Sequence, residues 1–176
     1  MRSWIQWVTV PALVAAPAYA VQYLTVKQAQ EALFPSGVRF VPYPLELDAA
    51  QREAIEEASG QRVRERKPQV WQALAGERPA GWFFVDQVIG KHEFITYALA
   101  VGPEGVVRGI EVMDYRETYG GEISNVEWRR QFAGKRHGDD LKLGSDIRNI
   151  SGATLSCRNV TNGVKRLLAM RALVLK

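Results

Sequence analysis

Apolar and β-branched residues are densest in the second half of the chain. Phe94 to Val101 and Val106 to Met113 are two such runs, joined by the turn sequence Gly102-Pro-Glu-Gly105. Two apolar runs around a short glycine-containing turn are typical of a β-hairpin. Trp82 to Ile89 has the same aromatic and β-branched character and predicts a further strand.

The pattern before this region is more mixed. Thr25 and Asp48 are N-cap residues, and they predict a short helix and a second helix over residues 49–58. Residues 38–47 are rich in strand-forming residues but are interrupted by two prolines, which favours an edge strand or an extended segment. Residues 63–75 fit a helix or a strand equally well.

Helical signals return toward the end of the chain. Residues 125–132 predict a short helix, and residues 156–173 predict a longer one. In the longer segment apolar residues recur at helical spacing: Val160, Val164, Leu167, Leu168 and Leu173. Strands followed by helices, with no internal repeat and no linker, predict an α+β fold. We expect a single domain with an antiparallel sheet flanked by helices.

Composition limits the possible functions. The chain has 176 residues and a formal net charge of +4, with 23 basic and 19 acidic residues. This small and scattered surplus argues against nucleic acid as a partner. Cys157 is the only cysteine, which excludes an intrachain disulfide and thiolate clusters. His137 lies close to Asp139 and Asp140, but a solvated acidic turn explains this group better than a cation site, and no metal is predicted.

The first twenty residues have the features of a signal peptide. Met1 and Arg2 precede an apolar run, and Ala18-Tyr-Ala20 fits the small-x-small pattern of a signal-peptidase site. We expect cleavage after Ala20. A retained membrane anchor is the alternative, because no charge occurs between Arg2 and Lys27. Both interpretations place the remaining chain in the periplasm or otherwise outside the cytoplasm.

The segment Asn149-Ile-Ser-Gly-Ala-Thr-Leu-Ser156 lies directly before the predicted C-terminal helix. Ser151, Thr154 and Ser156 provide hydroxyl groups, and Gly152 allows backbone angles that other residues avoid. Free N–H groups at the start of a helix bind anions, so the segment suits a phosphate. From these residues alone, an ordinary capped loop remains the alternative.

Several motifs in a fixed order make this chain resemble a known family. They are Gly90-Lys-His-Glu-Phe-Ile-Thr-Tyr97, the hairpin, Glu117-Thr-Tyr-Gly120, Trp128 and Ile150-Ser-Gly-Ala-Thr154. Together they resemble the FMN-binding domain family, which includes the periplasmic flavoprotein subunits of sodium-pumping NADH:quinone reductase and of Rnf-type ferredoxin:NAD oxidoreductase. The family commonly has Glu-Thr-Pro-Gly after the hairpin, and this chain has Tyr119 in place of the proline.

The resemblance implies that FMN is the cofactor. In the family a Ser/Thr-Gly-Ala-Thr motif carries FMN through a phosphoester on its last threonine, which corresponds to Thr154. The cofactor-binding residues expected around this bond are Ser151, Gly152, Ala153 and Ser156. Glu117, Thr118 and Gly120 are expected near the flavin ring or the ribityl chain. The candidate ring neighbours are aromatic: Tyr115, Tyr119 and Trp128.

The same resemblance implies an electron carrier that is not itself a substrate-converting enzyme, although flavin reductase activity stays open. A separate flavin transferase would attach the FMN, so Thr154 is an acceptor and no catalytic residue is predicted. A membrane-bound oxidoreductase would donate or accept electrons. The alternative is a binding or sensing module that holds FMN or another phosphorylated ligand without a covalent bond. We expect residues 1–20 to be the signal peptide, residues 21–80 an extension packed on the same domain, and residues 81–176 the FMN-binding domain.

Overall fold

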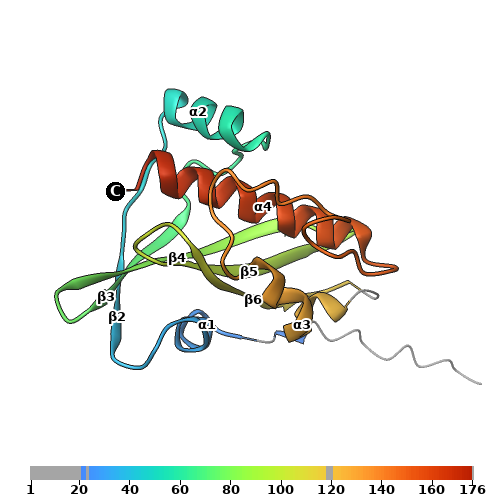
Figure 1. Ribbon diagram of the computed structural model, residues 1–176, viewed down its shortest axis with the longest axis horizontal. Helices are drawn as coiled ribbons and strands as arrows, with labels where there is room; N and C mark the ends of the chain where they lie inside the picture. Colours follow the sequence, from blue (N-terminus) through green and yellow to red (C-terminus); the bar gives the residue numbers. More distant parts are fainter. Residues whose placement is uncertain (1–20, 23, 118–120, 176) are drawn as a thin grey trace, which may run out of the picture.

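The strands of this chain form one antiparallel sheet in the computed structural model, which describes residues 21–22, 24–117 and 121–175. Their order across the sheet is β1-β6-β5-β4-β3-β2 (Figure 1). The bounds are Val21–Gln22 for β1, Val38–Pro42 for β2, Gln69–Ala75 for β3, Arg78–Ile89 for β4, Phe94–Val101 for β5 and Val107–Tyr115 for β6. The predicted α+β class is confirmed.

The predicted hairpin is β5 and β6. Its turn is closed by the Gly102 N–H, which donates to the Val106 carbonyl at 2.8 Å, and by the Gly105 N–H, which donates to the Gly102 carbonyl at 3.0 Å. Gly105 has φ +84°, a left-handed conformation that glycine adopts without steric cost. Local turn chemistry explains why the sequence predicted the hairpin, whereas its register shifts twice along the strands, at Thr96/Tyr97 and at Ala100/Val101.

The strands with weaker sequence signals depend on their neighbours. Residues 38–47 contribute β2, which lies at one edge of the sheet as the prolines predicted. In the segment 63–75, residues 69–75 form a strand, β3, that pairs with β2 on one side and β4 on the other, and residues 63–68 form neither a helix nor a strand. β4 begins at Arg78, earlier than the predicted Trp82, because its first residues pair with the end of β3.

Four α-helices surround this sheet within the described part of the chain: α1 Val26–Leu33, α2 Ala49–Ser59, α3 Val126–Arg129 and α4 Thr154–Leu173. The two N-caps predicted from sequence are confirmed, and both are capping boxes: Thr25 with Gln28, and Asp48 with Gln51. Each pair satisfies two N–H groups at the start of its helix.

Two predicted helices differ in detail. The segment 125–132 is α3 followed by a short 3₁₀ helix, Arg130–Phe132, rather than one continuous helix. The C-terminal helix begins at Thr154, two residues earlier than expected, so the threonine of the motif is itself helical. Leu173 was expected on the apolar stripe, but it is 47% exposed, and the buried residue near this end is Leu175.

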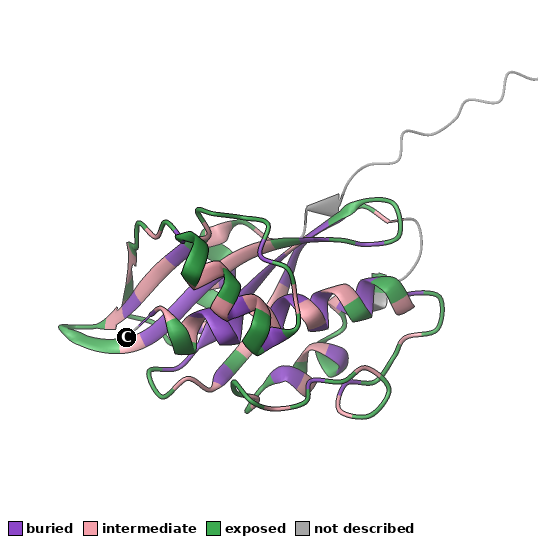
Figure 2. Cartoon of the chain, turned by 90° about the horizontal axis from the view of Figure 1, so that it is seen from above, coloured by how far each residue is buried: buried purple, intermediate pink, exposed green. Residues whose placement is uncertain are grey.

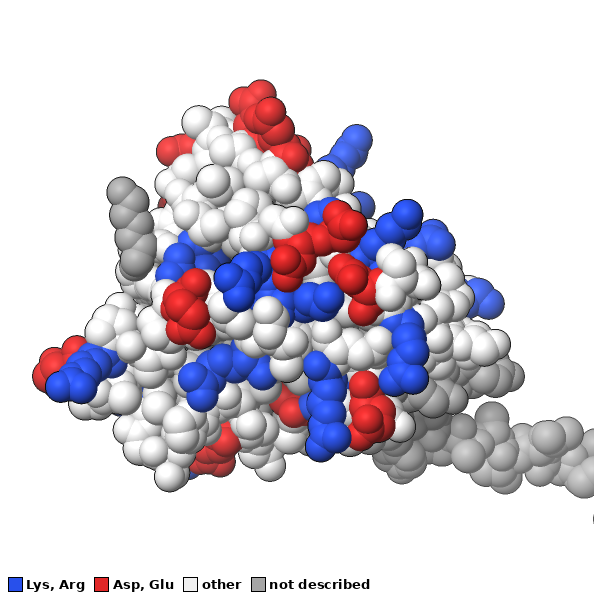
Figure 3. All heavy atoms as spheres, viewed as in Figure 1, with Lys and Arg blue, Asp and Glu red and all other residues white. Residues whose placement is uncertain are grey.

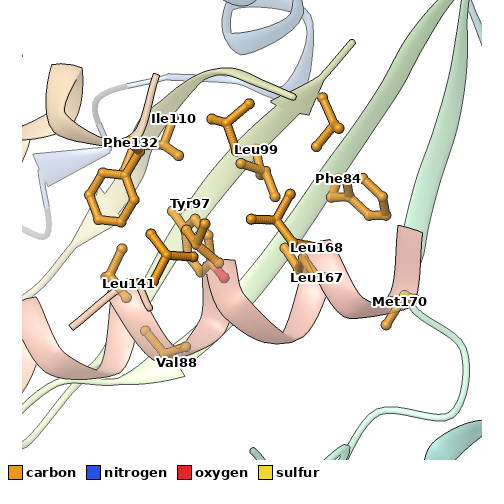
Figure 4. Close-up of a cluster of buried hydrophobic side chains, with 14 of the residues drawn as sticks. Phe84, Val88, Tyr97, Leu99, Ile110, Phe132, Leu141, Leu167, Leu168 and Met170 are labelled. Carbon is orange, nitrogen blue, oxygen red and sulfur yellow. The ribbon is translucent and has the colours of Figure 1, made fainter. Parts of the chain in front are cut away.

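The sheet is covered on both faces. α4 packs along one face with α2 outside it, and α1 lies on the opposite face (Figure 1). The inner side of α4 is buried (Figure 2), while α2 mixes exposed and partly buried residues and buries only Ile55 and Ser59. Figure 4 shows side chains of α4 meeting those of the strands, among them Leu167, Leu168, Phe84 and Leu99. This packing holds α4, and therefore the motif at its start, rigidly against the sheet.

Candidate functional site

The start of α4 differs from the starts of α1 and α2. Its N-cap is Ala153, and no side chain caps the helix. The first backbone bond runs from the Cys157 N–H to the Ala153 carbonyl at 2.9 Å. The N–H groups of residues 154–156 therefore have no acceptor inside the helix. Such an end favours an anion, because the exposed N–H groups and the helix dipole both present positive charge.

A tight turn brings the chain to this helix. The Ala153 N–H donates to the Ile150 carbonyl at 3.0 Å, and Gly152 has φ +82°, which the turn requires and which favours glycine. Ser151 and Gly152 are exposed, whereas Ala153 and Ser156 are only 3% exposed. The motif therefore presents its outer residues to solvent and anchors the helix with its inner ones.

Thr154 is half-buried at the first helical position. Its Oγ1 accepts a hydrogen bond from Asn149 Nδ2 at 2.9 Å. Asn149 is exposed and lies on the other side of the turn. Sequence reasoning did not single out Asn149 as a partner of Thr154, since a separation of five residues gives no contact unless the turn folds back.

Both backbone polar groups of Arg148, the residue before Asn149, form hydrogen bonds. The Arg148 carbonyl accepts from Trp128 Nε1 at 2.8 Å, and the Arg148 N–H donates to Gln131 Oε1 at 2.8 Å. Trp128 is 4% exposed and packs edge-to-face on Phe132, with ring centroids 5.1 Å apart. These contacts make Trp128 a support of the motif loop. Gln131 has the same role, which was not evident from the sequence.

Glu117 lies at the end of β6. Its Oε1 accepts from the backbone N–H of His92 at 2.6 Å and of Glu93 at 3.1 Å, in the turn between β4 and β5. A Cβ atom at Gly90 would overlap this carboxylate, so a larger residue there would displace the Glu117 side chain. Burial raises the pKa of Glu117, but the hydrogen bonds from the His92, Glu93 and Lys91 backbone outweigh it, and the pKa is lowered from its ordinary value.

The roles of the other residues predicted around the flavin stay predictions. Thr118, Tyr119 and Gly120 lie outside the described residues. Tyr115 is 4% exposed and belongs to the core beneath α4. The role of Glu117 toward FMN stays a prediction, because its described hydrogen bonds hold the β4–β5 turn.

The β4–β5 turn lies at the same end of the sheet as the motif. Asn159, in the second turn of α4, donates through Nδ2 to the Ile89 carbonyl at 2.7 Å. Large apolar side chains are exposed here, with Ile89 at 40%, Phe94 at 58% and Leu155 at 43%. The uncapped helix start is therefore next to an apolar surface.

A groove of about 590 Å³ lies farther along α4. It forms beside the last residues of β4, which have no strand on that side because β3 begins only at Gln69, opposite Val85. Residues that line it include Arg62, Arg64, Asp86, Asn159 and Arg166, and none of residues 149–156 is among them. On the face drawn in Figure 3, acidic side chains lie among the basic ones. The motif thus lies outside this groove.

The described residues contain no group of three or more His, Cys, Asp or Glu side chains arranged to hold a metal ion. Among the helices of that same part of the chain, none is long and apolar enough to span a bilayer.

Two comparisons with known proteins gave matches. Residues 90–169 match the FMN-binding domain family, which confirms the resemblance and the expected cofactor, FMN. In structure the chain is similar to NqrC of Shewanella oneidensis, with a TM-score of 0.56 and 17% identity over 82% of this chain and 88% of that one. This likeness shows a shared fold. The comparison with curated proteins gave no match.

Proposed function

We propose, because residues 90–169 match the FMN-binding domain family, that this protein is an extracytoplasmic electron-transfer flavoprotein carrying FMN through a phosphoester on Thr154. The observation that carries the proposal is the position of Thr154. Its hydroxyl is half-buried at the first residue of a helix whose start has no side-chain cap. A phosphate joined to this oxygen would face the free N–H groups of the first helical turn.

The residues present fit a phosphate and do not fit a cation. The turn before Thr154 offers backbone N–H groups, and no carboxylate occurs between Ile147 and Lys165. Arg148 and Arg158 are exposed on the two sides of the motif, close enough in sequence to favour a bound anion. Gly152 keeps the turn free of a side chain that would crowd the phosphate.

Covalent attachment through the phosphate would retain FMN and would leave its ring free to exchange electrons. Bound FMN supplies one-electron and two-electron transfer.

An accessible ring suits an electron carrier that meets protein partners. We propose a membrane-bound oxidoreductase as donor or acceptor, and a flavin transferase that loads Thr154 before the carrier works. We further propose that the first twenty residues direct export, so that loading and electron transfer occur outside the cytoplasm.

The test is co-expression with an active flavin transferase, followed by intact mass and absorbance after denaturation. The wild-type protein should stay yellow and be heavier by one FMN less one water. Thr154→Val removes the acceptor oxygen at nearly constant volume and should abolish the added mass. Thr96→Val is the matched control, since its hydroxyl contacts Gln87 on the sheet. Ser151→Ala should only slow loading.

Two outcomes would contradict the proposal. One is retention of flavin through denaturation in Thr154→Val, which would move the bond elsewhere. The other is wild-type protein that gains no mass with an active transferase. Yellow protein that loses its colour on denaturation would support the alternative of non-covalent FMN.

A further inference from the structure

We infer that Asn149 is a positioning residue for the Thr154 hydroxyl, fixing this oxygen as the acceptor of the flavin phosphate. The inference rests on the proposed function. It assigns a role to a residue outside the Ser-Gly-Ala-Thr sequence. The contact that carries it is the hydrogen bond from Asn149 Nδ2 to Thr154 Oγ1, 2.9 Å long.

Asn149 is held in place by the backbone around it. Trp128 and Gln131 fix the carbonyl and the N–H of Arg148, each at 2.8 Å. On the other side, the bond from the Ala153 N–H to the Ile150 carbonyl closes the turn. The backbone on both sides of Asn149 is therefore fixed by hydrogen bonds, and the Asn149 side chain contacts Thr154 across the turn.

The direction of this hydrogen bond matters for the chemistry. The amide donates, so it occupies one lone pair of Oγ1 and leaves the hydroxyl proton free to point away from Asn149. Threonine side chains otherwise choose between staggered rotamers. The amide selects one of them, which reduces the number of orientations an approaching phosphorus meets.

Loading is a phosphoryl transfer from a flavin dinucleotide that the transferase supplies. The O–H bond of Thr154 breaks, an Oγ1–P bond to the FMN phosphorus forms, and the bond from that phosphorus to AMP breaks. AMP leaves and the proton passes to the transferase or to solvent. The product ester carries a negative charge, and the Asn149 amide remains next to it as a neutral donor.

A purely structural role of Asn149 predicts a different order of loading rates among its variants. If Asn149 only stabilised the helix start, Asn149→Asp would be tolerated or favourable, since a carboxylate near a helix N-terminus is stabilising. If Asn149 positions the hydroxyl, Asn149→Asp should slow flavin loading the most. It replaces the donor by an acceptor and introduces a negative charge beside a phosphate. Asn149→Ala should be intermediate.

The experiment measures the rate of mass gain for purified apoprotein mixed with a flavin transferase and FAD. We expect Asn149→Ala to load roughly five- to tenfold more slowly than wild type, the effect of one lost hydrogen bond, and Asn149→Asp more slowly still. Asn162→Asp is the matched control, because it adds the same charge on α4 beyond the motif and should load at the wild-type rate. Thermal unfolding is measured on the same variants, and the order of loading rates should not follow the order of stability, because Asn149→Asp should load slowest without being the least stable.

A second readout does not need flavin. Three-bond NMR couplings of Thr154 in the apoprotein should report one rotamer in wild type and an average in Asn149→Ala. Wild-type loading kinetics in Asn149→Asp would overturn the inference while leaving covalent attachment intact. An unchanged rotamer in Asn149→Ala would also overturn it. Failure of the wild-type protein to load would instead overturn the proposed function, and this inference with it.

Discussion

A Cβ atom on Gly163 would overlap the hydroxyl oxygen of Tyr97, so a glycine is what allows α4 to lie directly over this ring. The Tyr97 hydroxyl donates to Asp86 Oδ2 at 2.6 Å, and Arg166 Nη2 donates to the same oxygen at 2.6 Å. Tyr97 is fully buried. One polar cluster thus connects β4, β5 and the helix that carries the motif.

Gly163→Ala should destabilise the protein. Overpacking costs roughly 1–3 kcal/mol, while the higher helix propensity of alanine returns about 1 kcal/mol. We expect a net loss of about 1 kcal/mol in the free energy of unfolding in urea. In protein that already carries Tyr97→Phe, which lacks the clashing oxygen, Gly163→Ala should lower the free energy of unfolding by less than it does in wild type. An increase in stability for Gly163→Ala alone would show that the helix can shift away from the ring.

The Tyr97 phenol should resist ionisation. Burial, followed by the charge of Asp86 and their hydrogen bond, raises its pKa well above 10.0, and these causes outweigh the opposite effect of Arg166. A raised folded-state pKa means that its stabilisation is complete below the unfolded value and is lost as the pH rises through the folded one. Ultraviolet titration of wild type against Tyr97→Phe should show one tyrosine that ionises only as the protein unfolds in alkali. A Tyr97 that ionises near its ordinary pKa in folded protein would contradict this.

Glu117→Ala should loosen the turn between β4 and β5. The change removes the acceptor of two backbone N–H groups and should cost about 1 kcal/mol. Glu117→Gln keeps an oxygen acceptor and should lose less. Because the pKa of Glu117 is lowered, its stabilisation is present above the ordinary value of 4.5 and is lost as the pH falls through the lower folded value.

Urea unfolding at several acidic pH values measures this dependence. The wild-type curve should fall more steeply than that of Glu117→Gln below the ordinary carboxyl pKa. Parallel curves would show that the hydrogen bonds to the turn do not depend on the charge. FMN should still attach to both variants, since neither changes the motif.

Gln131→Ala should release the loop before the motif without unfolding the protein. It removes the bond to the Arg148 N–H, while Trp128 still holds the Arg148 carbonyl. Hydrogen exchange at the Arg148 amide should quicken, and flavin loading should slow. Gln87→Ala, which removes an exposed bond to Thr96, is the control and should change neither. Unchanged exchange at Arg148 would mean that Trp128 alone fixes the loop.

The mature protein should begin at Val21. The leader ends in Ala18-Tyr-Ala20, which fits a signal-peptidase site. N-terminal sequencing of periplasmic protein tests this directly. A chain that keeps Met1 and is found in the membrane fraction would favour the retained anchor.

The sequence alone determined the features that depend on near neighbours. The Asp48 cap, the Gly102–Gly105 turn and the strand-forming runs act within a few residues of each other, so their physical preferences are visible in the printed chain. The order of motifs likewise predicted the FMN-binding domain, which the family match at residues 90–169 confirmed.

The tertiary structure decided what depends on contacts between distant residues. Residues 63–75 could form a helix or a strand until β2 and β4 supplied hydrogen bonds on both sides. The bond from the Trp128 indole to the Arg148 carbonyl, twenty residues away, became visible only in the fold. Asn149 meets Thr154 because a turn with left-handed Gly152 folds the chain back. These contacts form only when helices and strands pack together, so the sequence of neighbouring residues does not reveal them.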